Sequence, residues 1–204
     1  MRISWLGHAC FMVEHDGYRV VIDPLCDVPG CRNTSAEAEE VLCSHDHFDH
    51  NYRKGVTLQL GKDSPFTVET VKTFHDDKSG TLRGDNTIHI LRAGGMKLVH
   101  LGDLGHPLSD AQTENLRGCD VLLIPVGGTY TVDGDATAEI VKNLQPRVAV
   151  PMHYRGDTFG FDNIDTLESF LAHFAPEEVR FADSSSLELT ADTPRGVMVL
   201  AFPV

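Results

Sequence analysis

Histidine and aspartate residues are concentrated in residues 44–50, which read Ser-His-Asp-His-Phe-Asp-His. Histidine is the commonest metal ligand in proteins, and a neighbouring carboxylate adds a hard oxygen ligand. Without a metal ion, three imidazoles this close would repel one another when protonated or leave ring nitrogens without partners. A solvated polar loop is the plainer interpretation, but the run directly follows the apolar, strand-like residues 40–43. Ligands at the end of a buried strand are well placed for chemistry, so we predict a metal site here.

Other ligand-type residues share one feature with this run, a position at the carboxyl end of a predicted strand. His75, Asp103 and His153 each lie at or just after such an end. Because strand ends at one edge of a sandwich converge, these side chains can meet although they are far apart in sequence. One zinc ion takes about three or four protein ligands. The candidate ligands therefore suffice for two ions: His45, His47, Asp49, His50, His75, Asp103 and His153.

The elements that must position these residues are mostly short strands. Alternating or β-branched apolar segments predict strands at residues 3–14, 18–22, 40–43, 65–74, 87–91, 97–101, 121–126, 147–152, 179–181, 187–189 and 196–202. Helical spacing predicts helices at residues 109–117, 136–144 and about 162–174, and a short helical turn near residues 36–39. Hairpins followed by helices that alternate with strands are typical of a layered α/β sandwich.

Size and composition favour one domain over residues 1–204. The formal net charge of −13 argues against a dedicated nucleic-acid binder, which needs a lysine- and arginine-rich surface. The five cysteines are odd in number and widely spread, so we expect reduced thiols in a cytoplasmic protein. We expect no signal peptide and no membrane span, because the chain enters a strand pattern at once and has no long apolar window. The expected partner is a small-molecule substrate, not a nucleic acid or a membrane.

Taken in order, the motifs resemble the metallo-β-lactamase superfamily, and more narrowly its short, single-domain, UlaG-like metal-dependent hydrolases. The run His45-x-His47-x-Asp49-His50 is the most specific signal. The other phrases are Gly-His-Ala-Cys-Phe at residues 7–11, Ile-Asp-Pro at 22–24, His-Leu-Gly-Asp-Leu-Gly-His at 100–106, Ile-Pro-Val-Gly-Gly-Thr-Tyr-Thr at 124–131 and Pro-Met-His-Tyr at 151–154. Together they span the chain from end to end.

This resemblance implies a four-layer αββα sandwich, the metallo-β-lactamase fold, with a two-metal site on its edge. Asp23 matches an aspartate that usually orients the ligand loop by contacting a histidine ligand. The implied cofactors are two divalent ions, with zinc favoured, although manganese, iron and nickel also suit histidine and carboxylate ligands. The implied ligand set is His45, His47 and His75 for a first ion, Asp49, His50 and His153 for a second, and Asp103 as a bridge.

The third histidine of the first ion is where this chain departs from larger members of the superfamily. His75 follows His50 by only 25 residues, a shorter interval than in those members. His89 and His100 are its rivals. His89 lies inside a predicted strand, where it would face solvent or a neighbour, and His100 has the opposite strand parity to Asp103. We therefore favour His75.

Two metal ions about 3.5–4 Å apart can share a hydroxide and polarise a scissile carbonyl or phosphoryl oxygen, so no serine or cysteine nucleophile is required. The chain has no Gly-x-Ser-x-Gly nucleophile motif, in agreement with this chemistry. We expect Asp49 both to bind the second ion and to orient the nucleophile or accept its proton. His106 lies three residues after Asp103 and could donate a proton to the leaving group, with a capping role as the alternative.

Four further residues are candidates around the site. His8 follows Gly7 at a strand bend, with either an active-site role or a structural hydrogen bond. Thr129 and Tyr130 follow a Gly-Gly pair and could line the pocket or simply pack the loop. Arg83 lies in a polar loop and could meet an anionic substrate.

The sequence thus favours a metal-dependent hydrolase that acts on a small ester, lactone or phosphodiester. A nuclease or phosphodiesterase acting on nucleic acid is the first alternative, although it would need a basic groove. A non-catalytic metal-binding protein is the second, although ligand-type residues at every expected position argue against it.

Overall fold

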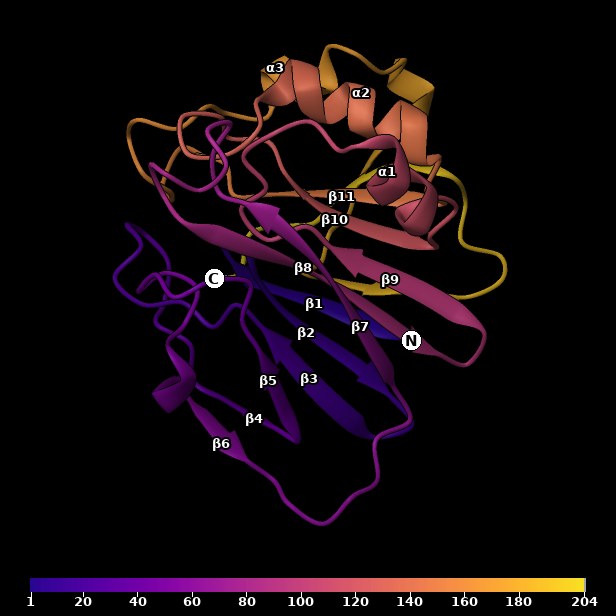
Figure 1. The fold of residues 1–204 in the computed structure, drawn as a ribbon. Coiled ribbons are helices and arrows are strands. Elements are labelled where there is room, and N and C mark those ends of the chain that lie inside the picture. Colours follow the sequence, from indigo (N-terminus) through magenta and orange to yellow (C-terminus); the bar gives the residue numbers. More distant parts are fainter. Residues whose placement is uncertain (204) are drawn as a thin grey trace.

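Two mixed β-sheets face one another in the computed structural model, which describes residues 1–203 (Figure 1). The smaller sheet has five strands in the order β13-β1-β2-β3-β5. They comprise β1 (Arg2–Gly7), β2 (Cys10–His15), β3 (Tyr18–Ile22), β5 (Glu40–Leu42) and β13 (Ser186–Glu188). The turn between β2 and β3 contains Asp16 and Gly17, the residue pair that favours a tight hairpin.

The larger sheet has seven strands in the order β12-β14-β11-β10-β9-β8-β7. Strands β10 and β11, in the middle of this order, are buried at every position. This is expected for neighbouring parallel strands that are covered on both faces. The strands are β7 (Thr67–Phe74), β8 (Asp85–Ala93), β9 (Met96–His100), β10 (Val121–Pro125), β11 (Val148–Met152), β12 (Val179–Phe181) and β14 (Gly196–Val199).

Three helices cover the outer face of the seven-stranded sheet: α1 (Asp110–Leu116), α2 (Gly134–Leu144) and α3 (Glu168–Leu171) (Figure 1). The hydroxyl of Ser109 caps α1, and the carboxylate of Asp133 caps α2. A short 3-10 helix, η2 (Pro176–Glu178), precedes β12. Among the residues that the structure describes, no helix has both the length and the apolar character needed to cross a bilayer.

The outer face of the five-stranded sheet is covered differently. A long loop, the parallel pair β4 (Ala36–Ala38) and β6 (Val56–Leu58), and the 3-10 helix η1 (Arg53–Gly55) lie on this side. Buried residues of this layer form a second, smaller hydrophobic cluster with Cys10 and Val21 of the sheet. Within residues 1–203 this layer contains no α-helix, so the α/β sandwich implied by the resemblance is present with one reduced outer layer.

The other predicted strands of both sheets and the helices at residues 109–117 and 136–144 are confirmed, apart from small shifts at their ends. The single strand predicted over residues 3–14 is wrong, because the chain turns at His8 and Ala9 and forms two antiparallel strands, β1 and β2. The helical turn predicted near residues 36–39 is wrong. Its Ala-Glu-Ala-Glu sequence has high helix propensity, but Ala36 and Ala38 pair with Val56 and Leu58 in β4–β6, and tertiary pairing overrides local propensity.

The helix predicted over residues 162–174 is largely wrong as well, because only α3 is regular. The backbone N–H of Asp165 donates to Gly127 O at 2.7 Å, and that of Arg155 donates to Asp165 O at 2.9 Å. These loop-to-loop hydrogen bonds use the backbone groups that an earlier helical start would need.

Candidate metal centre

Ligand-type side chains from both sheets converge on one edge of the sandwich. They follow β1, β5, β7, β9 and β11, and all of these strand ends except that of β1 were predicted from the sequence. Their donor atoms form three groups, and within each group these atoms lie within 4.8 Å of one another. The groups are His45, His47 and His75; His8, Asp49, His50 and His153; and His45, His50 and Asp103.

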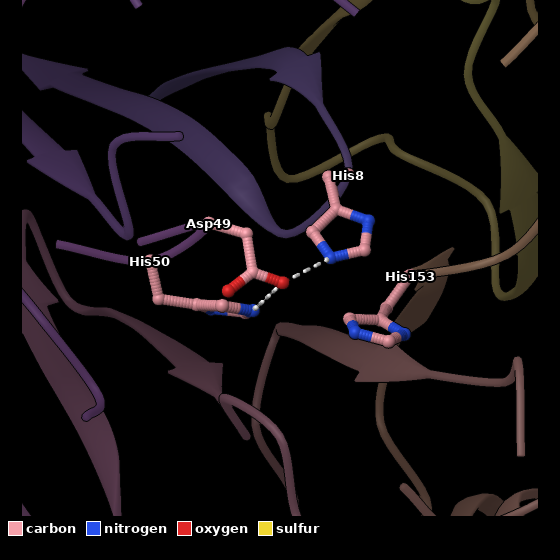
Figure 2. Close-up of side chains that lie close together, drawn as sticks. All are labelled: His8, Asp49, His50 and His153. Atoms are coloured by element: carbon pink, nitrogen blue, oxygen red, sulfur yellow. Dashed lines mark ion pairs between the residues drawn. The ribbon is translucent and has the colours of Figure 1, made fainter. Parts of the chain in front are cut away.

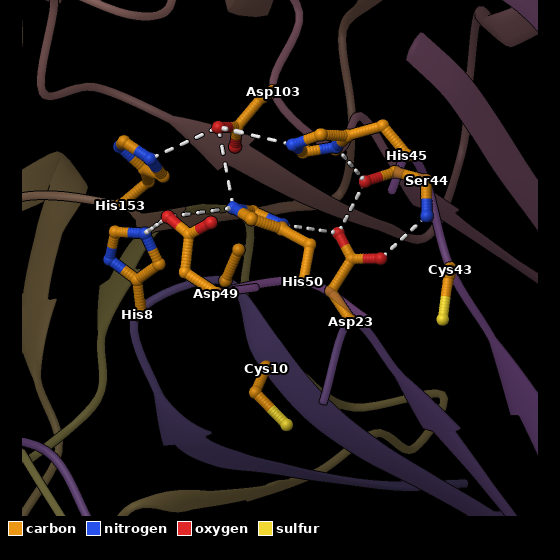
Figure 3. A network of polar contacts seen from close by, with 12 residues as sticks. His8, Cys10, Asp23, Cys43, Ser44, His45, Asp49, His50, Asp103 and His153 are labelled. Atoms are coloured by element: carbon orange, nitrogen blue, oxygen red, sulfur yellow. Dashed lines mark hydrogen bonds and ion pairs between the residues drawn. The ribbon is translucent and has the colours of Figure 1, made fainter. Parts of the chain in front are cut away.

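Asp103 lies between the first two groups. Its Oδ2 atom is 3.1 Å from His153 Nε2, 3.3 Å from both His50 Nε2 and His75 Nε2, and 4.0 Å from His45 Nε2 (Figure 3). The carboxylate is 2% exposed, so these histidines replace solvent around it. Although burial raises the pKa of this carboxyl, His153 and His50 hold it well below its usual range. One buried carboxylate in contact with histidines of both groups is the arrangement required of a bridging ligand.

Gly102 and Asn86 hold Asp103 in place. Gly102 has a φ of +56°, and a Cβ there would lie 2.3 Å from Asn86 Oδ1 and 2.5 Å from Ser44 Cβ, so only glycine fits. The same Asn86 Oδ1 accepts a hydrogen bond from the Asp103 backbone N–H at 3.0 Å.

Asp23 holds the histidine run in place by accepting hydrogen bonds from it. Its carboxylate accepts hydrogen bonds from His50 Nδ1 at 2.9 Å and from the Ser44 backbone N–H and hydroxyl, both at 2.6 Å (Figure 3). Since the Ser44 hydroxyl donates to Asp23, it accepts from His45 Nδ1 at 2.9 Å. These contacts fix the tautomers of His45 and His50 so that Nε2 of each ring lacks a proton in the neutral state and faces Asp103. Asp23 therefore contacts a candidate ligand and belongs to none of the three donor groups.

The hydrogen bonding of the buried donor atoms shows whether these residues fit a metal ion. Several buried side-chain atoms have no hydrogen-bond partner among residues 1–203, and such atoms are costly unless an ion or a solvent molecule satisfies them. They include His45 Nε2, His50 Nε2, Asp103 Oδ1 and both ring nitrogens of His8.

Protonation of these rings also agrees with metal binding. Burial lowers the pKa of His45 to about 3, so this imidazole is neutral near pH 7, as a metal ligand must be. Burial also disfavours charge on His50, but the Asp103 and Asp23 carboxylates raise its pKa well above the ordinary value. A divalent cation at this position competes with that proton for the same nitrogen.

His8 belongs to the second donor group, beside Asp49 and His153 (Figure 2). Its Nε2 lies 3.4 Å from Asp49 Oδ2, and its ring centroid lies 4.0 Å from that of His153. Burial and the neighbouring His153 lower the pKa of His8 to about 4. The sequence suggested a supporting or substrate-binding role, and the structure makes His8 a candidate metal ligand as well. The sequence did not mark this position as a strand end, because residues 3–14 read as one strand with a bend at Gly7.

The structure brings His75, and neither of its rivals, to the site. His100 is turned away: its Nε2 donates to Ala9 O at 2.9 Å and its Nδ1 accepts from the Gly102 N–H at 3.0 Å. His89 lies opposite His100 in the β8–β9 register and is buried at 5% exposure, so of the two expected positions it faces neighbouring residues and not solvent.

A cavity of about 560 Å³ opens over the donor groups. Tyr130 lines it, and its carbonyl accepts a hydrogen bond from His75 Nδ1 at 3.0 Å. Thr129 lies outside the lining, with its hydroxyl donating to Asn163 O at 2.6 Å, and so ties two loops together. The remaining lining residues are Asp46, His47, Phe48, Asp49, His75, Arg83, Asp103, His153 and Phe161.

His106 does not line this cavity. Its Nε2 accepts a hydrogen bond from the Phe74 N–H at 3.2 Å, and its Nδ1 donates to Pro107 O at 2.7 Å. With both ring nitrogens in backbone contacts, the structure favours the capping role over proton donation to a leaving group.

Comparisons with known proteins agree with this site. Residues 2–153 match the family described as "Beta-lactamase superfamily domain". A UPF0173 protein of Pyrococcus furiosus is 34% identical over 180 residues, which cover 76% of this chain and 83% of the relative. A UPF0173 metal-dependent hydrolase of Carboxydothermus hydrogenoformans is 29% identical over 191 residues, covering 76% and 84%.

A solved structure from Thermotoga maritima is similar over almost the whole chain. It belongs to a protein proposed to be a zinc-dependent hydrolase of the metallo-β-lactamase superfamily. The TM-score is 0.75 at 32% identity, with 98% of this chain and 97% of that chain covered. The converging donor groups, the family match and these relatives lead to one conclusion: this chain belongs to the metallo-β-lactamase superfamily and is one of its metal-dependent hydrolases.

Proposed function

We propose that the protein hydrolyses a small ester, lactone or phosphodiester with the help of two divalent metal ions. The observation that supports two ions is the position of Asp103, whose Oδ2 contacts histidines of two separate donor groups. His45, His47 and His75 would hold the first ion, and Asp49, His50 and His153 the second, with His8 as a further candidate ligand. When bound, such a pair lowers the pKa of a water molecule and polarises the oxygen of the scissile bond.

Asp49 has the position expected of the group that orients the nucleophile. It lines the cavity, its side chain is 13% exposed, and its Oδ2 lies 3.4 Å from His8 Nε2 and 3.7 Å from His50 Nε2. Burial raises the pKa of this carboxyl, but His8 and His50 lower it below the usual range, so Asp49 is ionised near pH 7. An ionised carboxylate at the cavity wall can accept a hydrogen bond or a proton from the attacking water.

The substrate in this proposal is a small molecule. A cavity of about 560 Å³ is within the range of pockets that enclose metabolite-sized ligands. The formal charge of −13 and a single arginine in the lining disfavour a long nucleic acid, which needs an extended basic groove. We place the chain with the short, UlaG-like hydrolases because its motifs span one domain of this length.

Zinc is the favoured metal, because neutral histidines and carboxylates in sets of three or four are typical zinc ligands. Manganese, iron and nickel use the same donors, and their supply in the cell also decides occupancy. The unpaired cysteines agree with a reducing, cytoplasmic location.

Variants of two ligands test this function. In full-length protein reconstituted with zinc, Asp103→Ala and His47→Ala should each lose bound metal and lower ester or lactone hydrolysis by at least about 100-fold. His173→Gln is the control, since this exposed histidine pairs with Asp135 of α2, away from the cavity. Unchanged hydrolysis in either ligand variant would contradict the proposal.

A further inference from the structure

Among the described residues, Arg83 is the one arginine or lysine that lines the cavity over the donor groups. Its guanidinium lies 5.5 Å from the centroid of the Tyr130 ring. Within residues 1–203, no carboxylate comes within 4.0 Å of this guanidinium, whereas Arg19, Arg92, Arg117 and Arg147 each have such a partner. An arginine that faces a substrate cavity without a protein anion is available to bind an anion from outside.

The backbone around Arg83 is fixed by Asp76, the residue after His75. The Asp76 carboxylate, only 2% exposed as a residue, accepts hydrogen bonds from four backbone N–H groups. They belong to Lys78 at 2.8 Å, Gly80 at 2.9 Å, Leu82 at 3.0 Å and Arg83 at 2.7 Å. These four hydrogen bonds hold the backbone of residues 78–83 around one buried carboxylate.

The two ends of this loop are also joined by a hydrogen bond at His75, a candidate metal ligand. The His75 backbone N–H donates to Gly84 O at 3.0 Å, so the residues on either side of the loop are joined. Arg83 therefore cannot move far from His75 without breaking this contact or the Asp76 contacts.

The Tyr130 ring lies beside the Arg83 guanidinium and is itself held by hydrogen bonds of Tyr130. Its carbonyl accepts from His75 Nδ1 at 3.0 Å, and its hydroxyl accepts from Asn163 Nδ2. A ring held at both ends gives the guanidinium a face to stack on and leaves its N–H edge free for an anion. Arg83 and Tyr130 are thus both tied by hydrogen bonds to His75 or to its neighbour Asp76.

Two phenylalanines form an apolar part of the cavity wall. Phe48 is 55% exposed, an unusual position for a phenylalanine, and its ring centroid lies 6.5 Å from that of Phe161. Both residues line the cavity together with Arg83. The wall therefore offers an apolar surface and a cation to one and the same ligand.

We propose that Arg83, supported by Tyr130, binds a carboxylate or phosphate group of the substrate while Phe48 and Phe161 contact its apolar part. The substrate class is then a small ester or lactone with an anionic group away from the scissile bond. The identity of the bond that is hydrolysed, an ester or a lactone, rests on the proposed function. The anion site rests separately on the position of Arg83 and its contacts.

Three aryl acetates that differ only in the para substituent test the site. They are 4-acetoxybenzoate, 4-acetoxyphenyl phosphate and neutral methyl 4-acetoxybenzoate. In zinc-loaded wild-type protein, kcat/KM should be higher for one or both anionic esters than for the neutral one. Arg83→Gln should reduce that preference about tenfold, mainly through KM, because a charge-assisted hydrogen bond contributes roughly that factor. Arg83→Lys should keep part of it.

Lys72→Gln is the matched control. It removes one positive charge from strand β7, where Lys72 donates to Thr87 Oγ1 at 3.2 Å outside the cavity lining. The preference should be unchanged in this variant. An equal loss in Lys72→Gln and Arg83→Gln would indicate a general charge effect and overturn the proposal.

Binding separates this inference from the hydrolytic function. Calorimetric titration with benzoate, phenyl phosphate and neutral benzamide should show anion binding that weakens in Arg83→Gln, in zinc-loaded and in metal-free protein alike. Arg83-dependent binding without ester hydrolysis would leave the anion site standing and contradict the hydrolytic proposal. Hydrolysis with the same anion preference and anion affinity in wild type and Arg83→Gln would overturn the anion site alone. The tighter of the two anions identifies carboxylate or phosphate as the group bound.

Discussion

Three of the polar site residues adopt left-handed backbone conformations that are uncommon outside glycine. His8, Asp23 and His153 have φ values of 51°, 51° and 53°, and each follows directly on, or within one residue of, the end of a strand. Such a conformation costs about 1–2 kcal/mol for a residue with a side chain. The surrounding contacts maintain it, among them the hydrogen bond from the His153 N–H to His8 O at 3.3 Å. The sharp change of direction turns each side chain towards the shared edge of the sandwich.

The position of His8 gives a prediction for metal affinity. In His8→Phe the ring volume is retained while both nitrogens are removed, so a fourth ligand of the second ion would be lost. We expect one of two bound zinc ions to bind about 10–100-fold more weakly, measured by competition with a chromophoric chelator. The first ion, held by His45, His47 and His75, should be unaffected.

Two affinities that are the same in His8→Phe and wild type would show that His8 only packs against His153. Circular dichroism of the metal-free variant separates a loss of ligand from a loss of fold. His173→Gln again serves as the control for removal of a histidine elsewhere.

At the scale of elements, most strand ends and two of the helices that cover the seven-stranded sheet were predictable, whereas the layer that covers the five-stranded sheet was not. The strands before His75, Asp103 and His153 are apolar or alternating, so their ends, and hence the ligand positions, could be read from the chain. His8 was recognised only as a candidate, because no local pattern shows that the end of β1 meets the end of β11. The role of Arg83 depends on the Asp76 contacts, which involve residues two to seven positions later and leave no periodic signal.

The errors have the same origin. Residues 36–39 and 162–174 have helix-forming composition, and both are held in other conformations by partners distant in sequence. The covering layer of the five-stranded sheet therefore could not be predicted from local propensity. His106 suggested catalysis because it lies near a ligand motif, whereas in the structure its ring nitrogens contact the backbone of Phe74, 32 residues earlier, and of Pro107.

Glu39 joins strand β3 to the loop after β6 and gives a prediction for pH dependence. Its carboxylate accepts from the Arg19 side chain at 3.2 and 3.3 Å and from Lys62 Nζ at 2.8 Å. These partners, Arg19 first, lower the pKa of Glu39 from 4.5 to about 2. Because the folded-state pKa is depressed, the stabilisation is fully present above pH 4.5 and is lost as pH falls towards 2.

Glu39→Gln should therefore lower the free energy of unfolding by about 2 kcal/mol at pH 7, the size typical of hydrogen bonds to charged groups. The difference from wild type should shrink as pH falls from about 5 to about 3. Urea unfolding of both metal-free proteins at several pH values measures it. A difference that stays constant over this range would mean that the Glu39 charge does not contribute.

At the scale of the whole molecule, the candidate metal centre lies across the two sheets. His8, Asp23 and the histidine run belong to the edge of the five-stranded sheet, whereas the remaining candidates, His75, Asp103 and His153, follow strands of the seven-stranded sheet. Ions held by residues of both groups would therefore connect the sheets, so metal binding should contribute to stability as well as to chemistry.

The number of metal ions bound per chain tests the central claim most directly. Full-length protein is stripped with a chelator, reconstituted with excess zinc, freed of unbound metal and measured by elemental analysis against protein concentration. The two-ion site with Asp103 as bridge predicts two zinc ions per wild-type chain and fewer than one in Asp103→Ala. One ion or none per chain in protein that hydrolyses its substrate at full rate would contradict the account.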